Sequence, residues 1–183
     1  MKLGVYIGSF NPPHKGHIYV VNYLIQNNIV DKVLIVPTEN YWNKQNLVEL
    51  RHRINMLKFY ENDKIKIDQE NNEYLYTYLL MRKLKKDYVM DILYLIIGAD
   101  NIVHFDKWKN YQELLKYNII IMNRNDIDIE NYIKKYPNGH FIILKGFQPI
   151  DISSSKLRDT LDNQYLDNGI VQYIKKYNLY KNN

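Results

Sequence analysis

Residues 3–25 read LGVYIGSFNPPHKGHIYVVNYLI and contain three successive patterns. Leu3–Ile7 is a short apolar run that ends at Gly8, which is typical of a buried parallel strand ending before a turn. From Gly16 to Asn28, apolar residues recur at helical spacing. A strand joined to a helix through a short loop is the first half of a β–α–β unit. The segment therefore predicts an α/β fold that begins with this strand and helix.

The same alternation continues along the whole chain. Further strands are expected at Val33–Val36, Ile65–Ile67, Leu93–Ile97, Ile119–Met122 and Phe141–Leu144. Further helices are expected at Leu47–Tyr60, Tyr74–Lys86, Ile129–Tyr136, Ser153–Leu161 and Gly169–Tyr177. Strands that alternate with helices form parallel sheets through right-handed crossovers. We expect a single-domain, Rossmann-like, doubly wound and mostly parallel sheet flanked by helices over residues 1–183, with a C-terminal helical part at about 153–180.

The composition limits the class of protein. A chain of 183 residues with 46% hydrophobic and 25% charged residues suits one folded domain. The lack of cysteine excludes disulfides, thiolate nucleophiles and cysteine-ligated metal sites. The apolar run before Gly8 is too short for a signal peptide, and no stretch approaches 18 apolar residues. We expect a soluble, cytoplasmic protein with no membrane partner; the oligomeric state stays open, a homodimer included.

The net charge of +5 has two possible explanations. One is an anionic partner such as nucleic acid, a membrane or a phosphorylated substrate. The other is a compositional bias, because the chain has 20 Lys, 23 Asn and 18 Tyr but one Ala and five Arg. The basic runs Lys83–Lys86 and Lys134–Lys135 are short, and no RNA-binding aromatic motif is present. Nucleic acid is therefore not an expected partner, and bias explains most of the charge.

The loop from Gly8 to His17 has the residues of an anion site. Gly8 is expected to let the backbone turn sharply, and Gly16 to leave room where the helix begins. His14 and His17 are three residues apart, so both can face the free amides of a helix N-terminus. The alternative is a rigid turn with a capping histidine. A zinc site would need a third ligand at suitable spacing, and none is evident.

Two motifs at the ends of the chain carry a resemblance. Gly-x-Phe-x-Pro-x-His-x-Gly-His after a first strand resembles the signature of the nucleotidylyltransferase superfamily. The stretch ISSSKLR at residues 152–158 is similar to the family's Ile-Ser-Ser-Thr-x-Ile-Arg motif. The resemblance implies catalytic roles for His14, His17 and Arg158. It also implies an ATP site that includes these three residues and Gly8, Ser9, Phe10, Ile152, Ser153, Ser154 and Ser155. For the serines, N-capping of a helix is the simpler alternative.

A third segment narrows the resemblance. Residues 95–101 read LIIGADN, and Trp108 follows eight residues after Asp100, which resembles the nicotinate mononucleotide adenylyltransferases. In that family the glycine and aspartate of this motif, here Gly98 and Asp100, belong to the ATP site, with the aspartate near the ribose. The tryptophan stacks on the pyridine ring, which an aromatic face suits. A buried core tryptophan is the alternative for Trp108.

Other matches to this family are partial. Lys44 matches the lysine of a Pro-His-Lys loop that is implied to hold the mononucleotide phosphate, and Arg124 matches an arginine at a strand end. Thr77 is a further candidate for substrate binding, although Leu75 stands where the family has the threonine near the nicotinate carboxylate. The helix that contains Arg53 resembles a structural Arg-x-x-Met helix. A solvated lysine and an exposed loop arginine are the alternatives for Lys44 and Arg124.

The resemblance implies transfer of AMP from ATP to nicotinate mononucleotide, giving deamido-NAD and pyrophosphate. Mg²⁺ would accompany ATP, held by phosphates and water, with no dedicated metal site in the protein. A related transferase that uses nicotinamide mononucleotide, pantetheine phosphate or a cytidylyl substrate is one alternative. A non-catalytic nucleotide-binding protein is another. An assay of pyrophosphate release with different acceptors distinguishes these functions.

Overall fold

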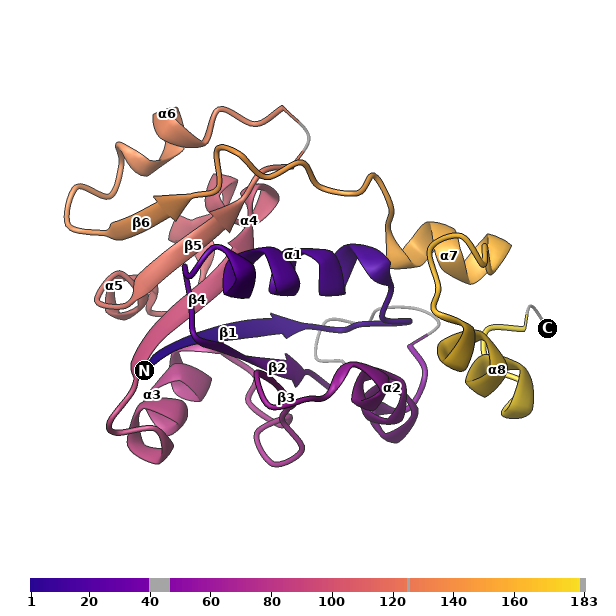
Figure 1. Cartoon of the computed structure of the whole chain (residues 1–183). Coiled ribbons are helices and arrows are strands. Elements are labelled where there is room, and N and C mark those ends of the chain that lie inside the picture. Colours follow the sequence, from indigo (N-terminus) through magenta and orange to yellow (C-terminus); the bar gives the residue numbers. More distant parts are fainter. Residues whose placement is uncertain (40–46, 125, 182–183) are drawn as a thin grey trace.

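The computed structural model describes residues 1–39, 47–124 and 126–181. A parallel sheet of six strands lies at the centre of the molecule (Figure 1). Its strands are β1 (Lys2–Gly8), β2 (Lys32–Pro37), β3 (Ile65–Ile67), β4 (Ile92–Gly98), β5 (Asn118–Met122) and β6 (His140–Ile143). Their order is β3-β2-β1-β4-β5-β6, and every adjacent pair is parallel. The order reverses between β1 and β4, as in doubly wound sheets, and the expected fold class is confirmed.

Helices connect the strands. They are α1 (Lys15–Gln26), α2 (Leu50–Leu57), η1 (Lys58–Tyr60), α3 (Thr77–Asp87), α4 (Ala99–Val103), η2 (Phe105–Lys107), α5 (Tyr111–Leu114), α6 (Ile129–Ile133), α7 (Ser154–Thr160) and α8 (Asn168–Lys176). The helix expected over 47–60 is divided into α2 and the 3₁₀ turn η1, and α3 starts three residues later than expected. The short elements between residues 99 and 114 were not expected, because one or two turns show no apolar period.

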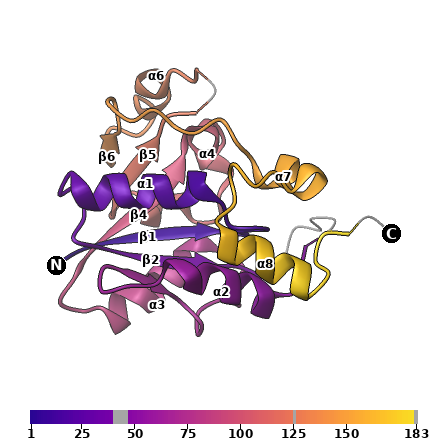
Figure 2. The same cartoon turned by 45° about the vertical axis from the view of Figure 1, so that its right-hand side comes forward.

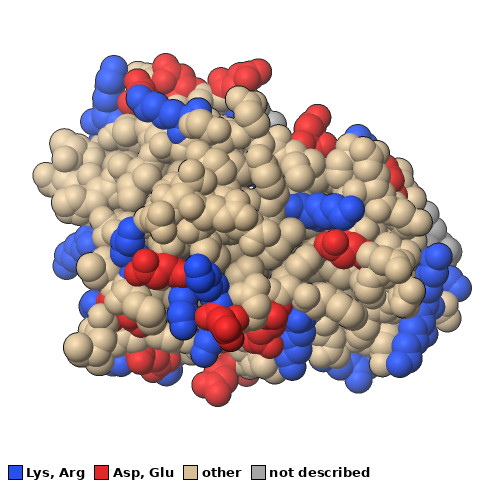
Figure 3. All heavy atoms as spheres, viewed as in Figure 1, with Lys and Arg blue, Asp and Glu red and all other residues tan. Residues whose placement is uncertain are grey.

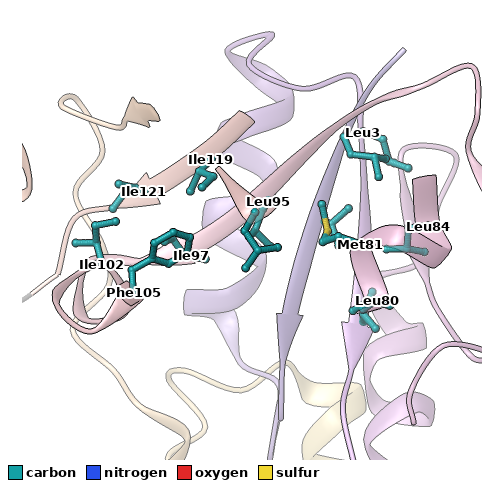
Figure 4. Close-up of a cluster of buried hydrophobic side chains, with 14 of the residues drawn as sticks. Leu3, Leu80, Met81, Leu84, Leu95, Ile97, Ile102, Phe105, Ile119 and Ile121 are labelled. Atoms are coloured by element: carbon teal, nitrogen blue, oxygen red, sulfur yellow. The ribbon is translucent and has the colours of Figure 1, made fainter. Parts of the chain in front are cut away.

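Strand side chains alternate between two cores, one on each face of the sheet. Figure 4 shows the first core, in which side chains from the strands meet α3, α4 and η2: Leu3, Leu95, Ile97, Ile119, Ile121, Leu80, Met81, Leu84, Ile102 and Phe105. On the other face, strand residues pack against α1 and α2, and the cluster includes Val33, Ile35, Ile96, Ile120, Val20, Val21, Leu24, Ile54 and Leu57. The two cores fix the sheet between its helices.

The C-terminal helices form a third apolar cluster. Met56 of α2, Leu157 of α7 and Ile170 of α8 are fully buried together. Figures 1 and 2 show α8 beside α2 and α7 beyond the tip of β1, where the first strand ends. This packing brings the second sequence motif, near residue 154, to the loop that follows β1.

The surface adds two observations. Among the residues that the model describes, no helix is both long and apolar enough to cross a membrane. On the face shown in Figure 3, basic side chains alternate with acidic ones along the lower edge. That distribution agrees with the compositional explanation of the net charge.

Candidate active site

The loop between β1 and α1 presents two stacked histidines. His14 is the N-cap of α1, and its Nδ1 accepts a hydrogen bond from the Gly16 amide at 3.1 Å. Nδ1 of His17 accepts from the His14 amide at 3.1 Å, and the two ring centroids are 3.6 Å apart. Because Nδ1 of each ring is an acceptor, each neutral ring carries its proton on Nε2. The arrangement that caps α1 therefore also leaves Nε2–H of each histidine as a donor.

Both imidazoles are neutral at pH 7. Burial, together with the smaller effect of the positive charge of Arg124, lowers the pKa of His14 to about 4. Burial also lowers the pKa of His17 well below its ordinary value, with contributions from His14 and Arg124. The pair therefore offers hydrogen-bond donors to an anion and carries no positive charge of its own.

The sharp turn of this loop lies at Phe10. Its φ is 47°, whereas none of the chain's seven glycines has a positive φ, so the expectation for Gly8 was wrong. A Cβ on Gly8 would lie 3.2 Å from the Phe10 ring, so glycine here makes room for that ring. A Cβ on Gly16 would lie 2.9 Å from the His14 ring, which confirms the expected need for space.

Side chains from α2 and α7 hold the backbone carbonyls of the loop. Nη1 of Arg53 donates to the Ser9 carbonyl at 2.8 Å and also to the Thr38 carbonyl at 2.7 Å. Oγ of Ser154 donates to the Pro12 carbonyl at 2.9 Å. Nη1 of Arg158 donates to the carbonyl of Asn11 at 2.8 Å. The two sequence motifs are therefore joined by hydrogen bonds, although more than 140 residues separate them.

A cavity of about 430 Å³ opens at the carboxyl ends of β1 and β4, where ligands bind in doubly wound sheets. It brings together sequence-predicted residues from five segments: Gly8, Ser9, Phe10, His17, Thr77, Gly98, Asp100, Trp108, Arg124 and Ser154. A smaller cavity of about 90 Å³ shares His17, Gly98 and Arg124 with it and is also lined by His14 and Ile152. Together the two cavities form a cleft over the topological switch point.

Charged and polar groups line this cleft. Nη1 of Arg124 lies 4.0 Å from Oδ1 of Asp100, and both side chains are about half exposed. A Cβ on Gly98 would lie 2.5 Å from the same Asp100 oxygen, so only glycine leaves the carboxylate in place. The Tyr6 ring lines both cavities and packs edge-on against Phe10. Burial raises the pKa of the Tyr6 phenol, so that its hydroxyl remains protonated.

The remaining residues of the second motif lie beside the cleft. Oγ of Ser153 caps α7 by accepting from the Lys156 amide at 3.3 Å, which supports the capping alternative for that serine. Nη2 of Arg158 donates to Oγ of Ser155 at 3.2 Å. Within the part of the chain that the model describes, Ser153, Ser155 and Arg158 do not line the two cavities.

A further hollow of about 440 Å³ adjoins the cleft, because Thr77 and Trp108 line both. Its other lining residues are Leu75, Tyr76, Lys107 and Lys109. The Trp108 ring lies 5.4 Å from the Phe105 ring, centroid to centroid, at the edge of the first core. Trp108 is therefore partly a core residue and partly a wall of the hollow.

Comparison with known proteins agrees with this geometry. The Cytidylyltransferase-like family model matches residues 5–160. A protein of Acholeplasma laidlawii named "Probable nicotinate-nucleotide adenylyltransferase" is 34% identical over 97% of this chain and 96% of its own length. The chain belongs to this family of nucleotidyltransferases. A Fusobacterium nucleatum adenylyltransferase of the same name is 33% identical over 93% of both proteins.

A solved structure extends the likeness to the fold. The nicotinic acid mononucleotide adenylyltransferase of Plasmodium falciparum, complexed with NaAD, has a TM-score of 0.81 and 27% identity. The match covers 98% of this chain and 97% of that one. This adenylyltransferase chain is therefore similar to a nucleotide-binding relative over almost its entire length.

Some residues of the adenylyltransferase site were not found from sequence, and one prediction stays open. Lys44 lies outside the described residues, so its role stays a prediction. Tyr6 precedes the first motif and Asn11 stands at one of its variable positions, so the motif itself does not single them out. Tyr180 donates to Oδ1 of Asn11 at 2.8 Å from a position 169 residues away. No local sequence signal can reveal such a contact.

The donor set of the cleft suits a cation that arrives with its nucleotide. Among the described residues, no group of three His, Cys, Asp or Glu side chains is arranged to hold a metal ion. Among the described residues that line the cleft, Asp100 is the acidic one. One carboxylate together with phosphate oxygens and water is an ordinary environment for Mg²⁺.

Proposed function

We propose that this adenylyltransferase transfers AMP from ATP to nicotinate mononucleotide, giving deamido-NAD and pyrophosphate. One observation carries the proposal: two neutral imidazoles line the cleft at the start of α1, and because Nδ1 of each accepts a backbone amide, Nε2–H of each remains a donor. Phosphate oxygens are the acceptors that a helix N-terminus with such donors suits. The complex of the Plasmodium falciparum relative with NaAD supports a dinucleotide product.

The reaction needs no covalent enzyme intermediate. An oxygen of the mononucleotide phosphate attacks the α-phosphorus of ATP in line, a new P–O bond forms, and the bond to the β-phosphate oxygen breaks. A phosphate monoester is already ionised at neutral pH, so no strong general base is required. Catalysis then consists of positioning the two phosphates and stabilising charge that develops on their oxygens.

The proposed roles combine the positions of the side chains with the family resemblance. His14 and His17 donate from Nε2 to oxygens of the α- and β-phosphates. Arg158 and the serines near it hold the leaving β- and γ-phosphates from the side of α7. Arg124 faces the cleft half exposed and is available to the mononucleotide phosphate. Lys44 is proposed for the same phosphate on the family resemblance.

Magnesium fits this arrangement as a companion of ATP. When bound, Mg²⁺ supplies neutralisation of phosphate charge, and Asp100 is the residue that would contribute a carboxylate ligand. The protein itself orients the phosphates through the imidazoles, the arginines and the amides at the start of α1.

The test is an assay of pyrophosphate release with the purified protein. ATP with nicotinate mononucleotide is expected to release pyrophosphate, and CTP is expected to be a poor substitute for ATP. Pantetheine phosphate and nicotinamide mononucleotide serve as competing acceptors. Pyrophosphate release only with pantetheine phosphate, or only with CTP, would overturn the assignment. ATP binding without pyrophosphate release in the presence of any of these acceptors would indicate a binding protein.

A further inference from the structure

The hollow beside Trp108 has an unusual charge for a site that receives a flat aromatic ring. Of its six described lining residues, Lys107 and Lys109 are basic and none is acidic. Both lysines are exposed, and the side chain of neither makes a hydrogen bond or an ion pair with another described residue. Two ammonium groups therefore flank the indole with no counter-ion among the described residues.

The other wall of the hollow is the start of α3, whose residues Tyr76 and Thr77 carry hydroxyl groups. Tyr76 is the N-cap of α3 and makes no side-chain capping bond, so the first amides of this 11-residue helix are not capped by a side chain. Leu75, beside it, is apolar, and the hydroxyls of Tyr76 and Thr77 are neutral. Among the described lining residues, the charge of the hollow therefore comes from the two lysines, and the start of α3 adds positive potential.

We infer that Lys107 and Lys109 determine the preference of this enzyme for an acceptor whose ring carries a carboxylate over one whose ring carries a carboxamide. The two groups have nearly the same shape, so the Trp108 face alone cannot separate them. They differ by one negative charge, and two unpaired ammonium groups favour the charged form. The inference rests on the proposed function, because it assumes that the pyridine ring occupies this hollow.

The expected size of the effect follows from the exposure of the lysines. Each exposed ion pair contributes a factor of about 1.4 to 5, so that replacing both lysines with glutamine lowers the preference by roughly 2- to 30-fold. Replacing both with glutamate adds repulsion and lowers it further. Because salt screens exposed charges, the preference of the unmodified enzyme also falls as ionic strength rises.

The experiment compares kcat/KM for nicotinate and nicotinamide mononucleotide in three proteins. These are the natural chain, the double variant Lys107→Glu/Lys109→Glu, and the control Lys64→Glu/Lys66→Glu. The control lysines have the same spacing and are exposed at β3, and Ile65 between them pairs with Val33 in the first half of β2, away from the cleft. Both double variants change the net charge by the same amount.

The inference predicts that the ratio of the two kcat/KM values falls at least tenfold in the Lys107/Lys109 variant and stays unchanged in the control. An unchanged ratio in the Lys107/Lys109 variant, or an equal fall in the control, would overturn it. So would equal use of both acceptors by the natural chain. Absence of pyrophosphate release with either acceptor in all three proteins would instead refute the proposed function.

Discussion

The two ends of the cleft are built in opposite ways. At the end that we propose to bind the phosphates, here called the phosphate end, the loop from Gly8 to His17 is held at its carbonyls by Arg53, Ser154 and Arg158, and its histidines are neutral. At the end that we propose to bind the pyridine ring, here called the ring end, the hollow beside Trp108 has two exposed lysines whose side chains form no ion pair with another described residue. One end is fixed by hydrogen bonds, and the other relies on unpaired charge.

The difference corresponds to the role that we propose for each end, phosphoryl transfer at one and recognition of the acceptor ring at the other. A transition state for phosphoryl transfer is stabilised by donors that are already in position, so a loop held at several carbonyls is favourable there. Recognition of a charged substituent needs only a positive potential, which exposed lysines supply without exact geometry. Changes at the phosphate end should therefore alter turnover and stability, and changes at the ring end should alter the choice of acceptor.

The largest effect is expected from His17→Ala, which removes a donor from the phosphate end. We expect turnover to fall by about 10³-fold, the effect of removing one preorganised donor, with a loss of about 1 kcal/mol from the capping interaction. Pyrophosphate release measures the first quantity and urea unfolding the second. The preference between the two acceptors should not change.

His52→Ala is the matched control for this variant. His52 is also a hydrogen-bonded histidine, with Nδ1 2.9 Å from the Tyr173 hydroxyl, but it lies between α2 and α8 and does not line the cleft. Its turnover should equal that of the natural chain. Near-normal turnover in His17→Ala would exclude the histidine from the mechanism.

The next largest effect is expected from Arg53→Met, which tests whether the loop depends on its anchors. The Arg53 side chain is fully buried and donates to the carbonyls of Ser9, Thr38 and Val48. Leaving three partly buried carbonyls without this donor should lower the free energy of unfolding by about 3 kcal/mol in a urea titration. Arg51→Met, an exposed position on the same helix, should change it by less than about 0.5 kcal/mol. Equal stability of the two variants would show that the loop does not need this anchor.

The pH dependence of the unfolding free energy should show how much stability depends on a neutral His14. The folded protein keeps His14 neutral down to about pH 4, whereas the unfolded chain binds a proton as the pH falls below the ordinary pKa of 6.5. The stability that depends on neutral His14 is complete above pH 6.5 and is lost as the pH falls toward 4, by up to about 3 kcal/mol. The expected result is a steep decrease in unfolding free energy over this range.

His14→Asn provides the comparison for the titration. Asparagine is a favourable N-cap, so it retains an acceptor for the Gly16 amide but does not titrate. The variant should show a shallower dependence of unfolding free energy on pH between 6.5 and 4. The same slope in both proteins would mean that other groups cause the acid sensitivity.

The parts of the fold that could be predicted are those that short-range sequence patterns indicate. Strand runs such as Leu93–Ile97 and the amphipathic pattern of α1 identified the sheet and its windings, because periodicity and turn residues act over a few positions. The short elements from 99 to 114 have no period to detect. The conformation of Phe10 was missed because positive φ is ordinarily assigned to glycine, and here burial of the ring in the second core accompanies it.

Prediction of the site followed the same division. The motif residues His17, Asp100 and Arg124 do meet in one cleft, as their positions at strand ends indicate. The contacts that hold the loop join residues far apart in sequence, such as Arg158 with Asn11, and depend on the packing of α7 and α8. Tertiary packing of this kind has no local signature.

The smallest effect is expected from Tyr180→Phe, which asks how far the phosphate end depends on its outermost anchor. The Tyr180 hydroxyl donates to Oδ1 of the buried Asn11 side chain, which also accepts from the Val48 amide at 3.2 Å. Because the second donor remains, the loss of unfolding free energy should be about 1 kcal/mol. The carbonyl of Asn11 is the acceptor for Arg158, so loosening this residue should also raise the KM for ATP.

Tyr173→Phe gives the matched comparison, since the Tyr173 hydroxyl of α8 is hydrogen-bonded to His52 and Asn55 of α2 and not to the loop. It should lose a similar amount of unfolding free energy and leave the KM for ATP unchanged. A rise in KM for Tyr180→Phe alone would mean that the C-terminal segment helps to position the phosphate end. Equal KM values in the two variants would limit Tyr180 to a stabilising contact, and the rigidity of the loop would then depend on Arg53, Ser154 and Arg158.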